Sequence, residues 1–307
     1  MSTRMPTPTE TARPAAGISE GTTAGTAAEP LLRVDDLRVS YPVKGWRTPP
    51  FQALKGVSID IHPGETLGLV GESGSGKTTL GRAVLGLAPI VGGTVSFAGD
   101  DITHWGRARR RTLSSDIQVV FQDPYTSLNP AMTVGDILAE PLRVSGVEKT
   151  AARRRIGELL DQVNLPANAA DRLPREFSGG QRQRVAIARA LALGPRLIVC
   201  DEPVSALDLS TQATVLDLFI DIQEQTGVAY LFVSHDLSVI RHISHRVAVM
   251  YRGDIVETGE AEIVTSAPAH PYTQRLLMAA PVPDPTRQAA RRAGRQALLA
   301  EQAGASK

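Results

Sequence analysis

The stretch Gly71-Glu-Ser-Gly-Ser-Gly-Lys77-Thr78 decides the fold of this chain. It follows the apolar run Thr66 to Val70, which predicts a strand, and precedes Thr79 to Leu87, which predicts a helix. The glycines let backbone N–H groups converge on phosphate oxygens, and the positive end of the helix faces the same anion. The pattern therefore predicts a triphosphate-binding loop.

Two side chains at the end of this loop have expected roles of their own. Lys77 would reach the β- and γ-phosphates as a point charge, and the Thr78 hydroxyl would bind Mg²⁺. The alternative is a glycine-rich turn without catalytic consequence. The residues expected to contact the nucleotide are Gly71, Glu72, Ser73, Gly74, Ser75, Gly76, Lys77, Thr78 and Thr79.

The composition predicts a globular protein rather than a membrane-spanning or nucleic-acid-binding one. With 307 residues and 42% hydrophobic residues, the chain can bury the core of one large or two modest domains. Its longest apolar runs, such as Val228 to Val233, fall far below the roughly 18 to 20 residues that a bilayer helix needs. The net charge of +1 gives no bias toward nucleic acid, and the single cysteine, Cys200, excludes an internal disulfide.

Both ends of the chain have the composition of tails. Met1 to Pro30 is rich in Thr, Ala, Gly and Pro and lacks the apolar region of a secretory signal, so we expect a disordered, cytoplasmic segment. Pro281 to Lys307 begins with prolines and becomes rich in Arg, Ala and Gln, a composition that specifies no fold.

Between the tails, apolar strand-like runs alternate with longer helical runs, which predicts an α/β domain with a largely parallel sheet. Ligands of such sheets bind at the carboxyl ends of the strands. Four candidate positions for the chemistry fall there: Gly71 after Leu67 to Val70, Gln122 after Ile117 to Phe121, Asp201 after Leu197 to Cys200, and His235 after Tyr230 to Val233.

Asp201 and Glu202 place two carboxylates where an apolar strand ends at the expected phosphate crevice. We expect Asp201 to hold Mg²⁺ and Glu202 to orient and deprotonate the attacking water. The alternative is that Asp-Glu-Pro only caps a helix.

Ser178-Gly-Gly-Gln181 precedes the helical run Arg182 to Leu193, which Gly194-Pro195 should end. A serine and two glycines at a helix start expose N–H groups and a positive pole to an anion. An ordinary N-cap explains the same residues equally well.

Together these segments resemble the ATP-binding subunits of ABC transporters, over roughly Leu31 to Ala280. The resemblance implies a P-loop NTPase fold with a RecA-like core, an antiparallel β subdomain and an inserted helical subdomain. The implied cassette spans 31–265, with the helical subdomain at about 123–190. The elements that match in the family's order are Gly71 to Thr78, Gln122, Ser178 to Gln181, Leu197 to Glu202, Ser205 to Asp208 and His235.

Three longer segments are similar to the ATPases of oligopeptide and dipeptide importers: Ile117 to Pro130, Glu176 to Arg184 and His270-Pro-Tyr-Thr273. Tyr41-Pro-Val-Lys44 and Pro281 to Pro285 are similar to the second of that system's two ATPases. This implies a family-specific extension at 266–285 and a polar tail at 286–307. Relatives can carry an iron–sulfur cluster near the extension, but this chain lacks the cysteines, so we expect none.

The resemblance also assigns roles to single residues. Tyr41 would stack on adenine, Gln122 would sense Mg²⁺ and the attacking water, and His235 would contact the γ-phosphate. In the alternative interpretations, Tyr41 is only an edge-strand aromatic, Gln122 is only a loop amide, and His235 is a core histidine. The ATP site of an opposing subunit would be completed by Ser178, Gly179, Gly180 and Gln181. Asp208 would link the ATP sites of the two subunits.

The implied partners are a second ABC ATPase subunit, two integral membrane permeases and, indirectly, an extracytoplasmic substrate-binding protein. The helical insertion Asp123 to Leu173 would dock a coupling helix of a permease, or it is a layer packed only for stability. The extension is either a docking helix or a terminal cap.

From the resemblance we expect a peripheral ATP hydrolase, with ATP and Mg²⁺, at the cytoplasmic face of the cell membrane. Peptides, nickel complexes and sugars are possible cargoes.

Two rival functions use the same ATP chemistry. One is an ABC ATPase that remodels DNA or RNA, and the other is a soluble ABC ATPase of a phosphonate-degrading complex. The chain lacks long coiled-coil insertions, and its basic clusters are short, which speaks against the first.

Overall fold

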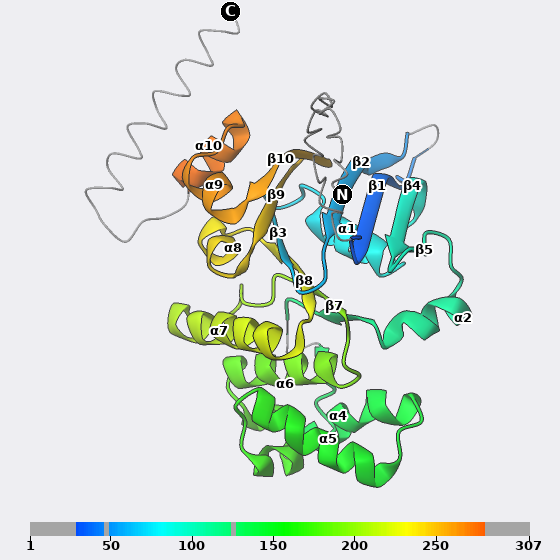
Figure 1. The fold of residues 1–307 in the computed structure, drawn as a ribbon, viewed down its shortest axis with the longest axis vertical. Helices are drawn as coiled ribbons and strands as arrows, with labels where there is room; N and C mark the ends of the chain where they lie inside the picture. The colour runs from blue at the N-terminus through cyan, green and yellow to red at the C-terminus, as the bar shows by residue number, and fades with distance from the viewer. Residues whose placement is uncertain (1–28, 46–48, 124–126, 280–307) are drawn as a thin grey trace, which may run out of the picture.

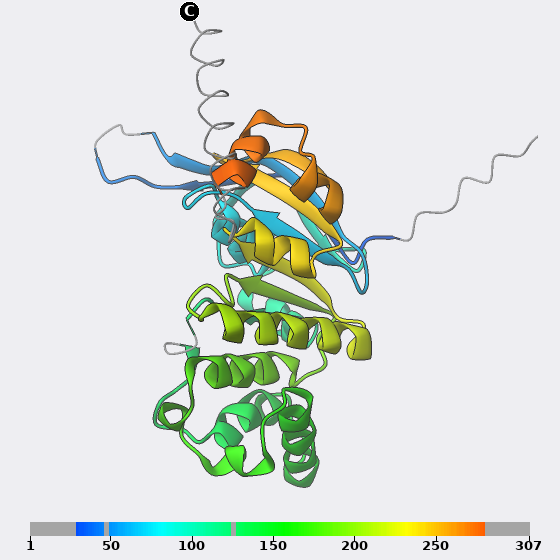
Figure 2. The ribbon, with the colours of Figure 1, turned by 90° about the vertical axis from the view of Figure 1, so that its left-hand side faces the viewer.

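Two β-sheets and a helical layer make up the computed structural model, which describes residues 29–45, 49–123 and 127–279 (Figures 1 and 2). Almost all of the tail at 1–30, residues 280–285 of the extension and the tail at 286–307 lie outside the described residues. The expectations for them stay predictions.

The larger sheet has six strands in the order β10-β9-β3-β8-β7-β6. Strands β9, β3, β8, β7 and β6 run parallel, and β10 pairs antiparallel with β9. Because both faces of this sheet are covered, its central strands have no face exposed to water, and β3 is buried along its whole length. The strands are β3 (Thr66–Val70), β6 (Ile117–Val120), β7 (Leu197–Asp201), β8 (Ala229–Ser234), β9 (Arg246–Tyr251) and β10 (Asp254–Glu260).

The smaller sheet is antiparallel, in the order β2-β1-β4-β5. In β1, buried and exposed residues alternate over much of the strand, as expected when one face meets the core and the other meets water. Its core face packs with α1 (Lys77–Val84) and one face of the parallel sheet in one hydrophobic cluster. The strands are β1 (Leu32–Tyr41), β2 (Phe51–Ile61), β4 (Ile90–Phe97) and β5 (Asp100–Asp101).

The opposite face of the parallel sheet packs against α6 (Gly179–Leu191), α7 (Leu209–Thr226) and α8 (Leu237–Ile243) in a second hydrophobic cluster. Phe219 of α7 is fully buried there. Its ring meets those of Tyr230 and Phe232 edge to face, with centroids 5.5 Å apart in both pairs. The two clusters place α1 and α6 on opposite faces of the sheet.

The helical layer lies at the end of the molecule away from the antiparallel sheet, below α6 and α7 in Figure 1. It consists of α4 (Val134–Val144), α5 (Lys149–Gln162), and the 3₁₀ turns η2 (Ala167–Asp171) and η3 (Pro174–Glu176). Each of the two α-helices buries one apolar stripe, with Ile137 and Leu138 on α4 and Leu159 and Leu160 on α5.

Short helices complete the described chain. The β5–β6 connection contains α2 (Arg107–Arg110) and the 3₁₀ turn η1 (Arg111–Ser114). After β10 come α9 (Ala261–Ser266) and α10 (Pro271–Ala279), which lie beside β9 and β10 in Figure 1. Across the described ranges, no helix combines the length and the apolar character needed to cross a lipid bilayer.

An ion-pair cluster links the two sheets. Arg246 of β9 contacts Asp60 of β2 and Glu65, the residue before β3, with N–O distances of 3.1 Å to each. Arg246 lowers the pKa of Asp60 by hydrogen bonding to its carboxylate.

The predicted fold class is confirmed, but two helix boundaries are wrong. The first helix begins at Lys77 instead of Thr79 and ends at Val84 instead of Leu87, because Gly86 turns the backbone with a φ of 72°. The helix expected at Arg182 to Leu193 spans Gly179–Leu191, because the Ser178 side chain caps it earlier.

We expect Phe219→Ala to lower the free energy of unfolding by about 3 to 5 kcal/mol, because it empties the centre of the aromatic group under the sheet. Urea denaturation measures this loss. Phe51→Ala is the matched control, because Phe51 is 59% exposed, and its effect should stay within about 0.5 kcal/mol. Equal losses in the two variants would contradict the assignment of Phe219 to the core.

Candidate functional site

The phosphate loop lies between β3 and α1 and is held by the turn that joins β9 to β10. A Cβ at Gly71 would lie 2.1 Å from the Met250 carbonyl oxygen, so only glycine fits there. Gly253 donates a backbone hydrogen bond of 2.8 Å to the Ser75 carbonyl. Gly76, with a φ of 116°, turns the chain into α1. The backbone thus forms a fixed cradle that closes in front of a helix start.

Lys77 is buried inside this cradle. Its Nζ donates to the Gly71 carbonyl at 2.7 Å and to the Glu72 carbonyl at 2.9 Å. Burial lowers the pKa of Lys77, and the nearby carboxylates of Glu202 and Asp201 oppose that shift. Within the described residues Lys77 has no ion-pair partner at salt-bridge distance, so an anion in the cradle would supply the missing countercharge.

Thr78 and Asp201 meet beside the lysine. The Thr78 hydroxyl donates a 3.0 Å hydrogen bond to Oδ1 of Asp201, the last residue of β7. A hydroxyl and a carboxylate oxygen are hard ligands of the kind that Mg²⁺ takes, so the two residues predicted to bind the metal fit that ion chemically. The structure therefore brings both together at the base of the phosphate cradle.

Glu202 and His235 form a second polar pair at the same edge of the sheet. His235 Nδ1 lies 3.0 Å from Oε2 of Glu202. The Glu202 side chain is only 18% exposed, whereas that of His235 is 56% exposed, which excludes the core-histidine alternative. Glu202 also has a φ of 48°, uncommon outside glycine, and its N–H donates to the Val233 carbonyl. This backbone contact fixes the main chain of Glu202 beside the end of β8.

Tyr41 and Gln122 lie at the ends of their strands. Tyr41 closes β1, packs partly buried against the hydrophobic cluster of the smaller sheet, and pairs in register with Phe51. Because β1 lies between β2 and β4, it is not an edge strand. Gln122 is exposed just after β6. Their predicted contacts with adenine and Mg²⁺ stay predictions.

Ser178 and Gln181 form a capping box at the start of α6. The Ser178 side chain accepts from the Gln181 N–H at 3.3 Å, and the Gln181 side chain accepts from the Ser178 N–H at 3.0 Å. The N-cap alternative is therefore realised in the structure, although a cap leaves the remaining N–H groups of the first turn available to an anion.

Asp208 lies at the start of α7, which packs against the start of α6. Its carboxylate caps α7, accepting from the Thr211 N–H at 3.0 Å and from the Ser210 hydroxyl at 2.7 Å. These hydrogen bonds lower the pKa of Asp208. A Cβ at Gly180 would lie 2.3 Å from Cγ2 of Thr211, so glycine lets the two helix starts pack closely. Gly179 lies in the first turn of α6 beside it.

The structure thus divides the predicted site into two groups. The phosphate loop, Asp201, Glu202 and His235 gather at the carboxyl edge of the parallel sheet. The cluster of Ser178, Gly180 and Asp208 belongs to α6 and α7, on the face of the sheet opposite to α1. Among the described residues, no hydrogen bond joins one group to the other.

Sequence reasoning missed the residues at the end of β9 and in the β9–β10 turn that hold the loop. Met250 and Gly253 contact the loop from more than a hundred residues further along the chain. The glycine after an apolar strand signals a turn, but no local pattern shows what the turn touches.

We expect Asp201→Asn to raise the melting temperature at pH 7 by a few degrees, because burial raises the pKa of the Asp201 carboxyl and makes its charged form unfavourable in the fold. The advantage should shrink as the pH falls toward the carboxyl's ordinary value of 3.8, where the native carboxyl becomes protonated. Thermal unfolding across this pH range tests it. Asp100→Asn, at an exposed carboxyl in β5, should show no comparable gain.

Comparisons with known proteins agree with this geometry. A family model described as "ABC transporter" matches residues 54–205, and one described as "Oligopeptide/dipeptide transporter, C-terminal region" matches residues 256–305. The oligopeptide transport ATP-binding protein OppD of Mycobacterium tuberculosis is 53% identical over 77% of this chain and 39% of its own length. The glutathione import ATP-binding protein GsiA of Escherichia coli K12 is 51% identical over 85% of this chain and 42% of its own length. The chain therefore spans about two fifths of the length of these relatives.

A solved structure has the same fold. It is a dimeric post-hydrolysis state of the ATP-binding cassette MJ0796 bound to ADP and Pi, with a TM-score of 0.66 and 27% identity over 75% of this chain and 98% of that one. The matched ranges contain the phosphate loop, the capped start of α6 and the carboxylate pair at the end of β7. The chain belongs to the ABC transporter family of ATP-binding proteins, and its C-terminal region is of the oligopeptide/dipeptide transporter type.

Proposed function

We propose that this chain binds and hydrolyses ATP as a subunit of an ABC importer for oligopeptides or dipeptides. One observation carries the proposal: three groups converge at one edge of the sheet. They are a buried ammonium that has no ion pair within the described residues, a hydroxyl–carboxylate pair, and a second carboxylate with its histidine. Phosphate binding, metal binding and water activation need these groups together.

In this proposal the phosphate loop holds the triphosphate through its backbone N–H groups and the Lys77 ammonium. Thr78 and Asp201 would hold Mg²⁺, which neutralises charge on the phosphate oxygens when it is bound. Gln122, from the end of β6, would add a further contact to the metal and the water. Tyr41 would stack on the adenine.

Glu202 acts on the attacking water. Its carboxylate orients the water and accepts its proton, while the Nδ1 contact from His235 holds the carboxylate in place. The backbone bond from Glu202 to Val233 limits the positions that this carboxylate can take. The exposed face of His235 remains available for the γ-phosphate.

A second ATPase subunit completes the site. Ser178, Gly179, Gly180 and Gln181 lie across the sheet from the phosphate loop of their own chain, so they would reach a nucleotide held by an opposing subunit. Asp208, packed beside them, would link the two sites. The dimeric state of the similar ATP-binding cassette MJ0796 supports this arrangement. The partner is either another copy of this chain or a similar ATPase.

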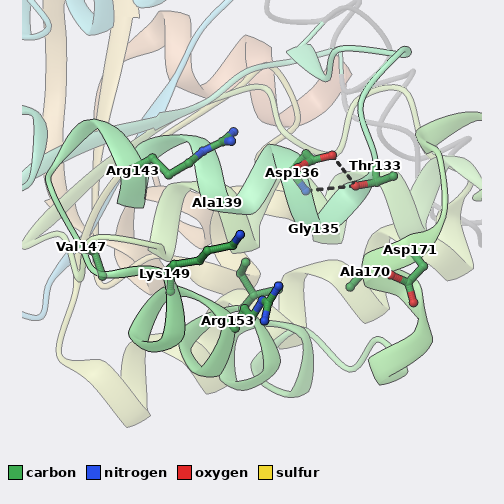
Figure 3. A pocket seen from close by; sticks show the side chains of 12 residues that line it. Thr133, Gly135, Asp136, Ala139, Arg143, Val147, Lys149, Arg153, Ala170 and Asp171 are labelled. Atoms are coloured by element: carbon green, nitrogen blue, oxygen red, sulfur yellow. Dashed lines mark hydrogen bonds between the residues drawn. The ribbon is translucent and has the colours of Figure 1, made fainter.

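The permease would dock in a cavity of about 660 Å³ between α4 and α5 (Figure 3). Three basic side chains line it, Arg143 from α4 and Lys149 and Arg153 from α5. Within the described residues none of the three forms an ion pair, so a partner helix with acidic residues or free C-terminal carbonyls would complement them. The other lining residues are Thr133, Gly135, Asp136, Ala139, Val147, Ala152, Ile156, Ala170 and Asp171.

The cargo class follows from the relatives. OppD is named for oligopeptides and GsiA for glutathione, itself a peptide, and the second family model is named for oligopeptide and dipeptide transport. These names favour peptide import over nucleic-acid remodelling or phosphonate degradation. We place the chain at the cytoplasmic face of the membrane, peripherally, with two permeases and, indirectly, a substrate-binding protein.

We expect Glu202→Gln to lower ATP turnover by at least about 10²-fold in the assembled complex, because the amide cannot accept the proton of the attacking water. ATP binding should persist, since the phosphate cradle is unchanged. Phosphate release measures the first and nucleotide affinity the second. Glu224→Gln, the same change at an exposed position on α7, is the control. Undiminished turnover would remove Glu202 from this role.

We expect Arg153→Glu to abolish recovery of the chain with its permeases, because it reverses the charge at the mouth of the α4–α5 cavity. Co-purification from membranes measures the association. Arg154→Glu makes the same change one residue along α5, outside the cavity lining, and should leave the complex intact. If both variants co-purify equally well with the permeases, the docking surface lies elsewhere.

A further inference from the structure

A tyrosine of the C-terminal region contacts the phosphate loop directly. The Glu72 backbone N–H donates a 3.0 Å hydrogen bond to the hydroxyl of Tyr272 on α10, 200 residues further along the chain. The Tyr272 side chain is almost fully buried, with 3% exposed, and burial raises the pKa of its hydroxyl. The phosphate loop is therefore in contact with an element that lies outside the 54–205 match.

The contacted N–H belongs to the same peptide group as the Gly71 carbonyl, to which Lys77 donates. One side of this peptide is held by Lys77 Nζ at 2.7 Å and the other by the Tyr272 hydroxyl at 3.0 Å. Because a peptide group is planar, fixing its N–H also fixes the direction of its carbonyl. Tyr272 thus orients the carbonyl that receives the lysine at the first turn of the loop.

The position of Tyr272 depends on how α10 is seated. Its ring packs on that of Tyr251, at the end of β9, with centroids 4.2 Å apart. Glu257 of β10 accepts from the Ala269 and His270 N–H groups at 2.7 and 3.2 Å, which fixes the segment leading into α10. A shift of α10 would therefore move the hydroxyl away from Glu72.

We propose that Tyr272 is a positioning residue for the phosphate loop, through which the C-terminal region sets the affinity of this chain for ATP. The proposal rests on the proposed function, since it assumes that the loop binds ATP. The sequence left the C-terminal extension as either a docking helix or a terminal cap. This proposal gives the extension a different and specific role. A cap would add stability to the fold and leave nucleotide affinity unchanged, whereas a positioning residue changes the affinity itself.

The test uses Tyr272→Phe in the full chain, which keeps the ring and removes the hydroxyl. We expect the dissociation constant for Mg·ATP, measured by calorimetry, to rise about 3- to 10-fold, the usual worth of one hydrogen bond. In the assembled transporter, KM should rise similarly while kcat changes less than twofold. Without nucleotide, hydrogen exchange of the Glu72 amide should become faster.

Tyr230→Phe is the matched control, because Tyr230 is a buried tyrosine of the same hydrophobic cluster whose hydroxyl donates to the Phe219 carbonyl of α7 instead of contacting the phosphate loop. It should lower the melting temperature without changing ATP affinity or exchange at Glu72. Glu257→Ala, which leaves Tyr272 intact but releases the start of α10, should weaken ATP binding in the same direction as Tyr272→Phe.

Unchanged affinity and unchanged exchange at Glu72 in Tyr272→Phe would overturn the inference. A wild-type chain that binds no Mg·ATP would instead overturn the proposed function. In that case the exchange measurement still decides whether Tyr272 holds the loop, because it needs no nucleotide.

Discussion

The burial of one ammonium group constrains the rest of this structure. Lys77 is taken out of water, and the loop carbonyls alone do not compensate its charge, so the fold is suited to an anion at this point. The nearby carboxylates of Asp201 and Glu202 contribute favourable charge without forming an ion pair with it. A direct salt bridge would occupy the position that a phosphate needs. The sheet edge therefore keeps its carboxylates close to the lysine but separate from it.

The two hydrophobic clusters explain why this site is divided. Alternate residues of the parallel strands point to opposite faces, so each strand contributes to both clusters. The phosphate helix α1 covers one face and α6 covers the other. The sheet therefore lies between these two helices, and a side-chain rearrangement alone cannot bring them together. This separation is what leads us to propose that a second subunit completes the site.

The parts of the site that could be predicted are those encoded by short spacing. The phosphate loop and the residues after β7 and β8 follow apolar runs directly, so periodicity and glycine placement locate them. The start of α6 was placed too late, since the capping box of Ser178 and Gln181 draws both glycines into the helix. The hydrogen bond from Glu72 to Tyr272 could not be predicted, because it depends on how the whole chain between these two residues folds. The β9–β10 turn was missed for the same reason.

The close contact of Gly180 with Thr211 has a mechanical consequence. With no side chain at position 180, the starts of α6 and α7 touch at van der Waals distance, and Asp208 ties the first turn of α7 to the preceding loop. A force applied to the outer helices would therefore move both helix starts as one rigid body. Motion of the helical layer would therefore reach both helix starts together, and the stiffness of this junction is set by the packing of position 180 against Thr211.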